Sequence, residues 1–226
     1  AYPLLVRSHE QDPPTNFRAQ ATMNICALLL LSAPIVILLV VYSTPFASAY
    51  FGSDYRNIAA TLIPWIATAM LLSYVRSLHF DIAFQISNRT TTITLIVGSA
   101  ALVNILLNIL LIPIWGLKGA AYSTLASFLL ALLLSVVAGQ RVLPMPFPLQ
   151  EVGKVIAGCA AMIGALLVVE RLPMLSENHL VFKVTLGLLA YVGTIWAMDT
   201  AHMRSKAMAR LQHVRCVRSA KIGIGR

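Results

Sequence analysis

The chain has 226 residues, of which 58% are hydrophobic and only 11% are charged. Soluble domains carry about 25% charged residues, so this composition excludes a soluble protein and indicates an integral membrane protein. The formal net charge is +9. The sequence holds no close carboxylate pair inside an apolar stretch, nucleophile motif, zinc-ligand spacing or glycine-rich phosphate loop. We therefore predict that the protein is not an enzyme and needs no metal or cofactor.

Six apolar stretches are long enough to cross a membrane as helices, and no strand-like alternation competes with them. They lie at about 23–42, 58–74, 93–113, 119–137, 152–169 and 180–198. We predict an all-α integral membrane fold, a six-transmembrane-helix bundle over residues 23–198. A polar N-terminal segment over residues 1–22 precedes the bundle, and a basic tail over residues 199–226 follows it.

The distribution of lysine and arginine predicts which side of the membrane each connection faces. The N-terminal segment, the second and fourth connections and the tail hold thirteen of these residues, and the other connections hold four. Because positive charge accumulates on the cytoplasmic side, both termini are expected in the cytoplasm. The chain begins with a polar stretch and without an initiating methionine, so we expect a fragment or one half of a longer protein.

The basic tail has an apolar stripe, which is typical of a helix lying on an anionic membrane surface. The stripe consists of Met203, Ala207, Leu211 and Val214. A partly disordered tail is the alternative. No base-reading module accompanies the charge, so a nucleic-acid partner is not expected.

Two asparagines, Asn104 and Asn108, lie four residues apart on one face of the third apolar stretch. An unpaired amide in an apolar environment costs about 1–3 kcal/mol, so both side chains should face protein or a wet cavity and not lipid. They could line a translocation path. Alternatively, they could form hydrogen bonds with a neighbouring helix, which are worth under about 2 kcal/mol each.

Prolines and glycines mark the expected bends and turns. Pro113, Gly116 and Gly119 predict a tight turn between the third and fourth stretches, followed by a helix whose thin first turn permits close packing. Pro34 and Pro64 lie inside the first two stretches, where proline removes a backbone hydrogen bond and bends a helix. We take these five residues as candidate hinges or kinks.

Small residues recur on one face of the fourth and fifth stretches, which predicts close helix–helix contact there. The two stripes are Ala120, Thr124, Ser127, Ala131 and Ser135, and then Gly153, Ala157, Ala161 and Ala165.

A dense polar group follows the second stretch at a membrane boundary. It comprises Arg76, His79 and Asp81, with Arg89 beyond. A cationic rim of this kind could bind phosphate or acidic sugar groups, because the guanidinium group matches phosphate oxygens in a bidentate manner. Alternatively, the arginines only follow the positive-inside distribution, and Asp81 pairs locally with Arg76 or Arg89.

The segment Asn104–Ala121 has the form Asn-x-x-x-Asn-x-x-x-x-Pro-x-x-Gly-x-x-Gly-Ala-Ala and resembles the mid-bundle hairpin of the polysaccharide flippases. That family belongs to the superfamily that also contains the multidrug and toxin extruders. An Ala-Tyr-Pro start at Ala1–Pro3, the intramembrane Pro34, Phe51-Gly52-x-x-Tyr55 and the Arg76–Asp81 connection agree with it. The resemblance extends to about Pro148 and implies the second lobe of a two-lobed flippase.

The resemblance further implies translocation of a polyprenyl-pyrophosphate-linked oligosaccharide across the bacterial inner membrane, for exopolysaccharide, capsule or O-antigen synthesis. Arg76 and Arg89 would face the pyrophosphate, and Asn104 and Asn108 would contact sugar hydroxyls. His79 and Asp81 complete the set of implied substrate-binding residues. The implied partners are the lipid-linked substrate, membrane lipids, and either a missing N-terminal lobe or other polysaccharide-assembly proteins. Two other functions compete: an exporter of small cations or drugs from the same superfamily, and a membrane-embedded glycan polymerase or ligase.

Overall fold

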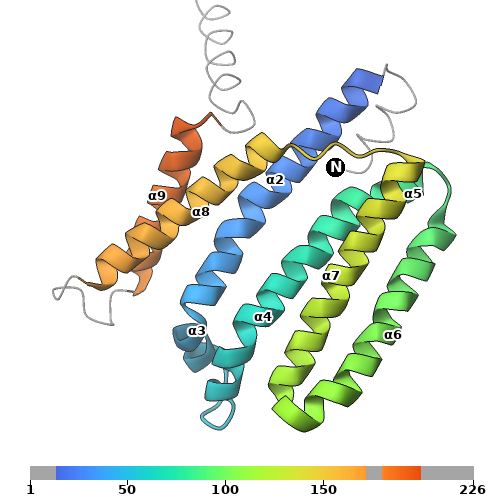
Figure 1. The fold of residues 1–226 in the computed structure, drawn as a ribbon. Helices are drawn as coiled ribbons and strands as arrows, with labels where there is room; N and C mark the ends of the chain where they lie inside the picture. The colour runs from blue at the N-terminus through green and yellow to red at the C-terminus, as the bar shows by residue number, and fades with distance from the viewer. Residues whose placement is uncertain (1–13, 172–179, 200–226) are drawn as a thin grey trace, which may run out of the picture. The chain divides into compact units, whose positions relative to one another are not determined.

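The computed structural model describes residues 14–171 and 180–199 (Figure 1). Regular structure in these ranges is helical throughout, with no strand. The helices form two compact units that divide after Pro148. The predicted basic tail from residue 200 onward and the first 13 residues lie outside the described ranges.

In the first unit, α4, η1 and α5 run on as one long helix, α6 and α7 are two further long helices, and α2 is followed by the short helix α3. Its elements are α2 (Pro14–Val41), α3 (Ser43–Tyr50), α4 (Arg56–Val75), the π turn η1 (Arg76–Phe80), α5 (Asp81–Ile86), α6 (Thr90–Trp115) and α7 (Leu117–Val142). Helix α7 lies between α4 and α6 and packs against both, and α2 packs against α4 (Figure 1). This arrangement makes α7 the central helix of the unit.

Six helices in the described part of the chain are long and apolar enough to cross a membrane. The shortest, α9 (Leu180–Ala197), has 18 residues, or about 27 Å at the usual helical rise. A typical hydrocarbon core is about 30 Å thick. The predicted all-α class with six spanning helices is confirmed, and the chain is a multi-pass helical membrane protein.

Two spanning helices extend beyond the boundaries expected from hydropathy. Helix α2 begins at Pro14 and not near Met23, because Phe17 and Ala21 are buried against Ile82. The second span does not stop at Tyr74 but continues through the π turn to Ile86. A span predicted from hydropathy ends at the first polar residues. Here the second helix continues past them, because Arg76 and Asp81 have hydrogen-bond partners.

The η1–α5 segment is anchored by three buried side chains that belong to three different core clusters. Phe84 packs with residues of α6 and α7, Ile82 packs with α2, and Phe80 packs with α2 and α4. Apolar burial on three sides fixes the direction in which the helix leaves the π turn. The polar side chains of the same segment are thereby held against α7.

The α6–α7 hairpin turns at Gly116, whose φ of 57° and ψ of −137° suit only glycine. Gly119 lies directly on the end of α6: an added Cβ would clash with the Leu111 carbonyl group and lie 3.0 Å from the Ile112 nitrogen. The predicted tight turn and backbone-thin first turn are confirmed. Pro113, like Pro34 and Pro64, lies inside a helix, and the hinge role of these prolines stays a prediction.

The second unit pairs α8 (Leu149–Glu170) with α9. The contact uses glycine on each helix: Gly158 lies against Tyr191 and Ile195, and Gly187 lies against Leu166. The contact with α9 does not use the predicted stripe that begins at Gly153, and close contact of that stripe stays a prediction. The buried face of α8 is Val155, Gly158, Met162, Leu166 and Val169. Large side chains opposite glycine fill the interface, so the smallest residues need not all lie in it.

We predict that Gly119→Ala lowers the apparent melting temperature of the detergent-solubilised protein, measured by circular dichroism. The added methyl group meets backbone and not a movable side chain, and such overpacking costs about 1–3 kcal/mol. The control is Gly98→Ala in α6, where a Cβ meets nothing within 4 Å and alanine favours the helix by up to about 1 kcal/mol. Equal melting temperatures for both variants would contradict the close approach at Gly119.

Candidate functional site

The polar residues at 76–81 form a π turn inside a spanning helix. The N–H of Asp81 bonds to the carbonyl of Arg76, five residues earlier, in place of the usual four. The extra residue in the turn brings positions 76 and 81 toward the same side of the helix. Single π turns of this kind are frequent at functional sites.

The Arg76 and Asp81 side chains form a direct ion pair, with 2.8 Å between Arg76 Nη1 and Asp81 Oδ2. The Ser135 hydroxyl of α7 donates to the other carboxylate oxygen, Oδ1, at 2.8 Å. The side chains of Arg76 and Asp81 are 13% and 4% exposed. Of the two pairings that the sequence allowed, the structure forms the one with Arg76. Arg89 lies exposed, immediately before α6.

This pair lies at a membrane boundary by helix length. Arg76 is about 30 Å along the helix axis from Arg56, and no charged residue lies between them. That distance matches the thickness of the hydrocarbon core. A buried charge at this depth is costly unless it is paired, and both carboxylate oxygens here have partners.

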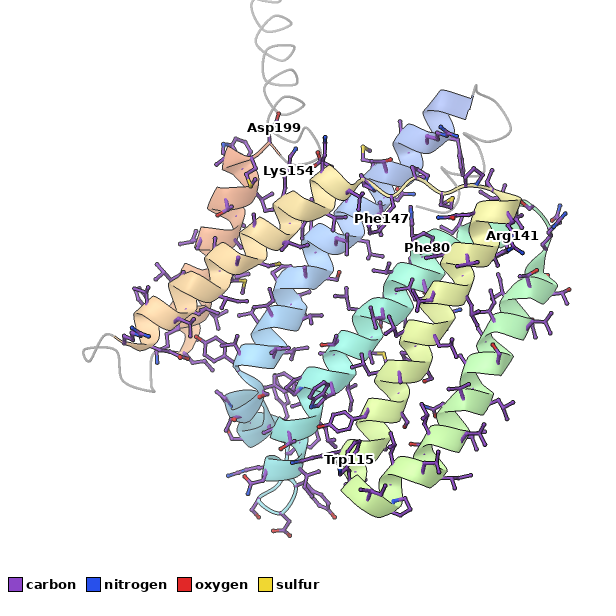
Figure 2. The ribbon with its side chains drawn as sticks, viewed as in Figure 1. Phe80, Trp115, Arg141, Phe147, Lys154 and Asp199 are labelled. Carbon is purple, nitrogen blue, oxygen red and sulfur yellow. The ribbon has the colours of Figure 1, made fainter. Side chains whose placement is uncertain are left out.

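His79 occupies the same π turn but points to a different partner. It is 1% exposed, and its Nε2 lies 3.1 Å from the carbonyl oxygen of Pro146. Phe80 stacks on Phe147, with 6.1 Å between ring centroids. Figure 2 shows Phe80 and Phe147 at one end of the first unit and Trp115 at the other. The π turn therefore holds the segment that follows α7.

Asn104 and Asn108 both point toward α7, which confirms that their amides face protein. Asn104 Nδ2 donates to Ser127 Oγ at 3.1 Å, and Asn108 Nδ2 donates to Asn104 Oδ1 at 3.0 Å. The Ser123 hydroxyl donates to Asn108 Oδ1. Each nitrogen and oxygen atom of the two carboxamides thus has at least one hydrogen-bond partner. The hydrogen bond across helices, one of the two roles expected for these residues, is present.

The partners of these bonds align along one face of α7, and the predicted stripe of small residues covers this face only in part. Buried small residues recur every four positions: Gly119, Ser123, Ser127, Ala131, Ser135 and Gly139. The predicted stripe had three of these positions but included Ala120 and Thr124 from the adjoining face and omitted Ser123. A strict four-residue period would have found Ser123, because i and i+4 lie on one helix face.

One cavity of about 310 Å³ brings two of the predicted site residues together. Its polar lining is Arg76, Asn104, Thr124 and Ser127, and its apolar lining is Val97, Ala100, Ala101, Phe128 and Ala131. Asn108, His79, Asp81 and Arg89 do not line it. Asp81 contacts Arg76, and Asn108 contacts Asn104, so each helps to position a residue that lines the cavity.

The arrangement has the chemistry of a binding site for a polar group. A guanidinium group, an amide and two hydroxyl groups face a space walled by aliphatic and aromatic side chains. Among the described residues, no group of three or more His, Cys, Asp or Glu side chains is placed to hold a metal ion. Such a cavity can accept an anionic or hydroxyl-bearing group that must be shielded from lipid.

Comparisons of the chain with protein-family models, with curated proteins and with solved structures found no match. The fold and helix hydropathy define the class, a multi-pass helical membrane protein.

We predict that removing one member of the ion pair destabilises the protein more than removing both. Arg76→Met or Asp81→Ala alone should cost about 3 kcal/mol, because each leaves an uncompensated buried charge. The double variant should cost less than either single change, because it leaves no uncompensated charge. Thermal unfolding in detergent measures all three, with Arg141→Met at the exposed end of α7 as the control. Additive losses would show that the pair contributes no coupling energy.

Proposed function

We propose that this chain is part of a flippase that moves a polyprenyl-pyrophosphate-linked oligosaccharide repeat unit across the bacterial plasma membrane. The product would enter exopolysaccharide, capsule or O-antigen synthesis. Two observations support the proposal: the resemblance of the Asn104–Ala121 hairpin to that family, and the cavity at Arg76 and Asn104 within spanning helices. The cavity carries the proposal, because a glycan headgroup needs a polar route that lipid cannot provide.

The cavity chemistry suits the two parts of such a headgroup. The Arg76 guanidinium has five N–H donors, and its Nη1 binds Asp81, so other donors are available for phosphate oxygens. Asn104, Thr124 and Ser127 supply amide and hydroxyl groups that match sugar hydroxyls. The polyprenyl chain needs no cavity, since it can remain in the bilayer while the headgroup crosses.

Transport by this mechanism needs a second wall around the path. In secondary transporters, repeats packed around a midplane site alternate their access by rocking against each other. We infer that an N-terminal lobe, or another polysaccharide-assembly protein, closes the cavity that η1, α6 and α7 line. Both termini would lie in the cytoplasm, which places the Arg76 end of the bundle on the side where the lipid-linked unit is made.

Export of small cations is the second candidate, and Asp81 favours it. Such exporters use a carboxylate inside the membrane, and Asp81 is a buried carboxylate at the membrane boundary of the continuous helix Arg56–Ile86. A cation would have to displace the guanidinium group that lies 2.8 Å from this carboxylate. The paired state of Asp81 therefore makes the flippase the better-supported function.

We predict that Arg76→Gln lowers polymer output about tenfold in a strain that lacks its own flippase and carries the gene for this protein. The loss corresponds to one charged hydrogen bond to phosphate. Arg141→Gln, a change at the exposed end of α7, is the matched control. Immunoblotting of membranes separates lost transport from lost protein.

Normal polymer output from Arg76→Gln at a normal protein level would show that Arg76 does not contact the transported substrate. Asp81→Asn distinguishes the two candidate functions. If it abolishes the efflux of a cationic dye while polymer output is normal, the cation exporter replaces the flippase.

The orientation yields a separate prediction. Alkaline phosphatase fused after Trp115 should be active, because that turn is expected outside the cytoplasm, and fusions after Asn88 or Pro146 should be inactive. Green fluorescent protein fused at the same positions should give the opposite pattern. An active phosphatase after Asn88 would reverse the assigned topology.

A further inference from the structure

A second cavity, of about 380 Å³, lies at the opposite end of the first unit from the π turn. Residues at the start of α4 and around the α6–α7 turn line it: Asn57, Ile58, Thr61, Leu62, Trp115, Leu117 and Lys118. It shares no lining residue with the cavity at Arg76. The start of α4 at Arg56 is about 30 Å along the helix axis from Arg76, so this cavity lies at the other membrane boundary.

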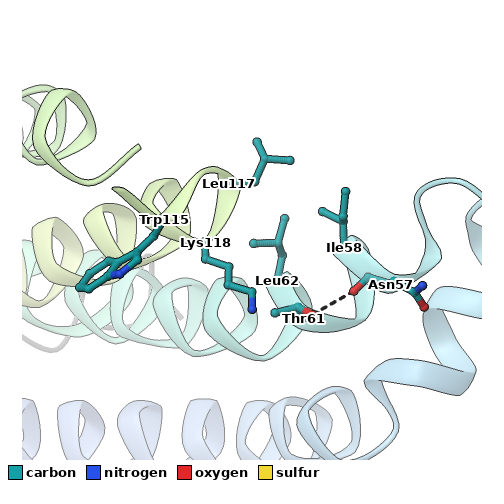
Figure 3. A pocket seen from close by; sticks show the side chains of 7 residues that line it. All are labelled: Asn57, Ile58, Thr61, Leu62, Trp115, Leu117 and Lys118. Atoms are coloured by element: carbon teal, nitrogen blue, oxygen red, sulfur yellow. Dashed lines mark hydrogen bonds between the residues drawn. The ribbon is translucent and has the colours of Figure 1, made fainter. Parts of the chain in front are cut away.

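The cavity offers one cation without a counter-charge. Lys118 is exposed and forms no ion pair with any described carboxylate. In Figure 3 its side chain extends from α7 toward α4, where the Thr61 hydroxyl is already bonded to the Asn57 carbonyl oxygen. The Lys118 ammonium group is therefore the principal donor available to an anion, and it lies against a mostly apolar wall.

The wall consists of side chains that suit lipid and not water. Ile58, Trp115 and Leu117 are 43%, 53% and 58% exposed. Trp115 packs edge-on against Tyr122, which also contacts Trp65, so an aromatic cluster stands at this depth. Tryptophan and tyrosine are enriched where hydrocarbon meets the headgroups.

The cavity also lies at the first turns of two long helices, α4 and α7. Backbone N–H groups in a first turn have no acceptor within their helix, and the helix dipole makes this end positive. The first turn of α4 adds to the charge of Lys118, whereas the dipole of α7 is opposed by that of α6, which ends at Trp115 on the same cavity. An anion here would meet positive potential on one side and apolar side chains on the other.

We propose that this cavity binds a membrane phospholipid, with the phosphate at Lys118 and an acyl chain along Ile58, Leu62 and Leu117. A free phosphate ion would gain from the cation but would have to share the site with an apolar wall. A phospholipid uses both parts of the lining. The proposal does not depend on what the protein transports.

The test uses phosphatidylglycerol with a photoactivatable group in its acyl chain, added to the purified full chain in mild detergent. After irradiation, mass spectrometry of peptides locates the cross-links. We expect cross-links on residues 56–62 and 115–118, and their yield should fall about fivefold in Lys118→Gln, the effect of one lysine near a membrane surface. Lys183→Gln is the matched control, because Lys183 also lies in the first turn of a spanning helix but belongs to the second unit.

A second variant distinguishes a loss of lipid binding from a loss of folding. Asn57→Asp places a carboxylate on the cavity, which repels phosphate while it stabilises the first turn of α4. It should lower the yield at these peptides without a lower melting temperature. Unchanged yields in both variants, or an equal loss in Lys183→Gln, would overturn the proposal. Displacement by excess inorganic phosphate would also overturn it, because the site would then bind the free ion.

Discussion

The need of polar groups inside the bilayer for partners within the protein shapes the contacts of α5, α6 and α7. Helix α7 meets this requirement with a row of small residues at four-residue spacing, from Gly119 to Gly139. Its serines bond Asn104 and Asn108 of α6 and Asp81 of α5. The glycine at the start of the row lets α6 approach to backbone contact. Close packing and polar satisfaction therefore come from the same face of one helix.

The same requirement explains why charged residues can continue a helix that hydropathy would end. Arg76 and Asp81 neutralise each other, the π turn aligns them, and Ser135 takes the remaining carboxylate oxygen. Apolar anchors on either side, Phe80 and Phe84, supply the burial that holds the segment in place. The pair costs free energy on its own, but it fixes a guanidinium group at the wall of a cavity. A cation held in this way keeps its position without a ligand.

The two cavities of the unit differ in how they hold positive charge. At the Arg76 end the cation is buried, paired and directed into the bundle. At the Lys118 end it is exposed and unpaired among the described residues, beside tryptophan and aliphatic side chains. The cavity at Arg76 suits a polar headgroup that protein shields from lipid. The cavity at Lys118 suits the headgroup of a lipid that remains in the bilayer. The distance between them, about one hydrocarbon thickness, is set by the length of α4.

The sequence by itself determined the membrane class, the six spanning helices, the turn at Gly116 and the inward direction of Asn104 and Asn108. These follow from composition, span length, glycine geometry and the cost of an unpaired amide, which act locally. Only the tertiary structure decided that the second span runs to Ile86, that Asp81 pairs with Arg76 and not Arg89, and that Ser123 and Ser135 complete the network. It also decided that α8 contacts α9 through Gly158 and not through the stripe that begins at Gly153. Each of these depends on which side chain from another helix stands opposite, and no local pattern carries that information.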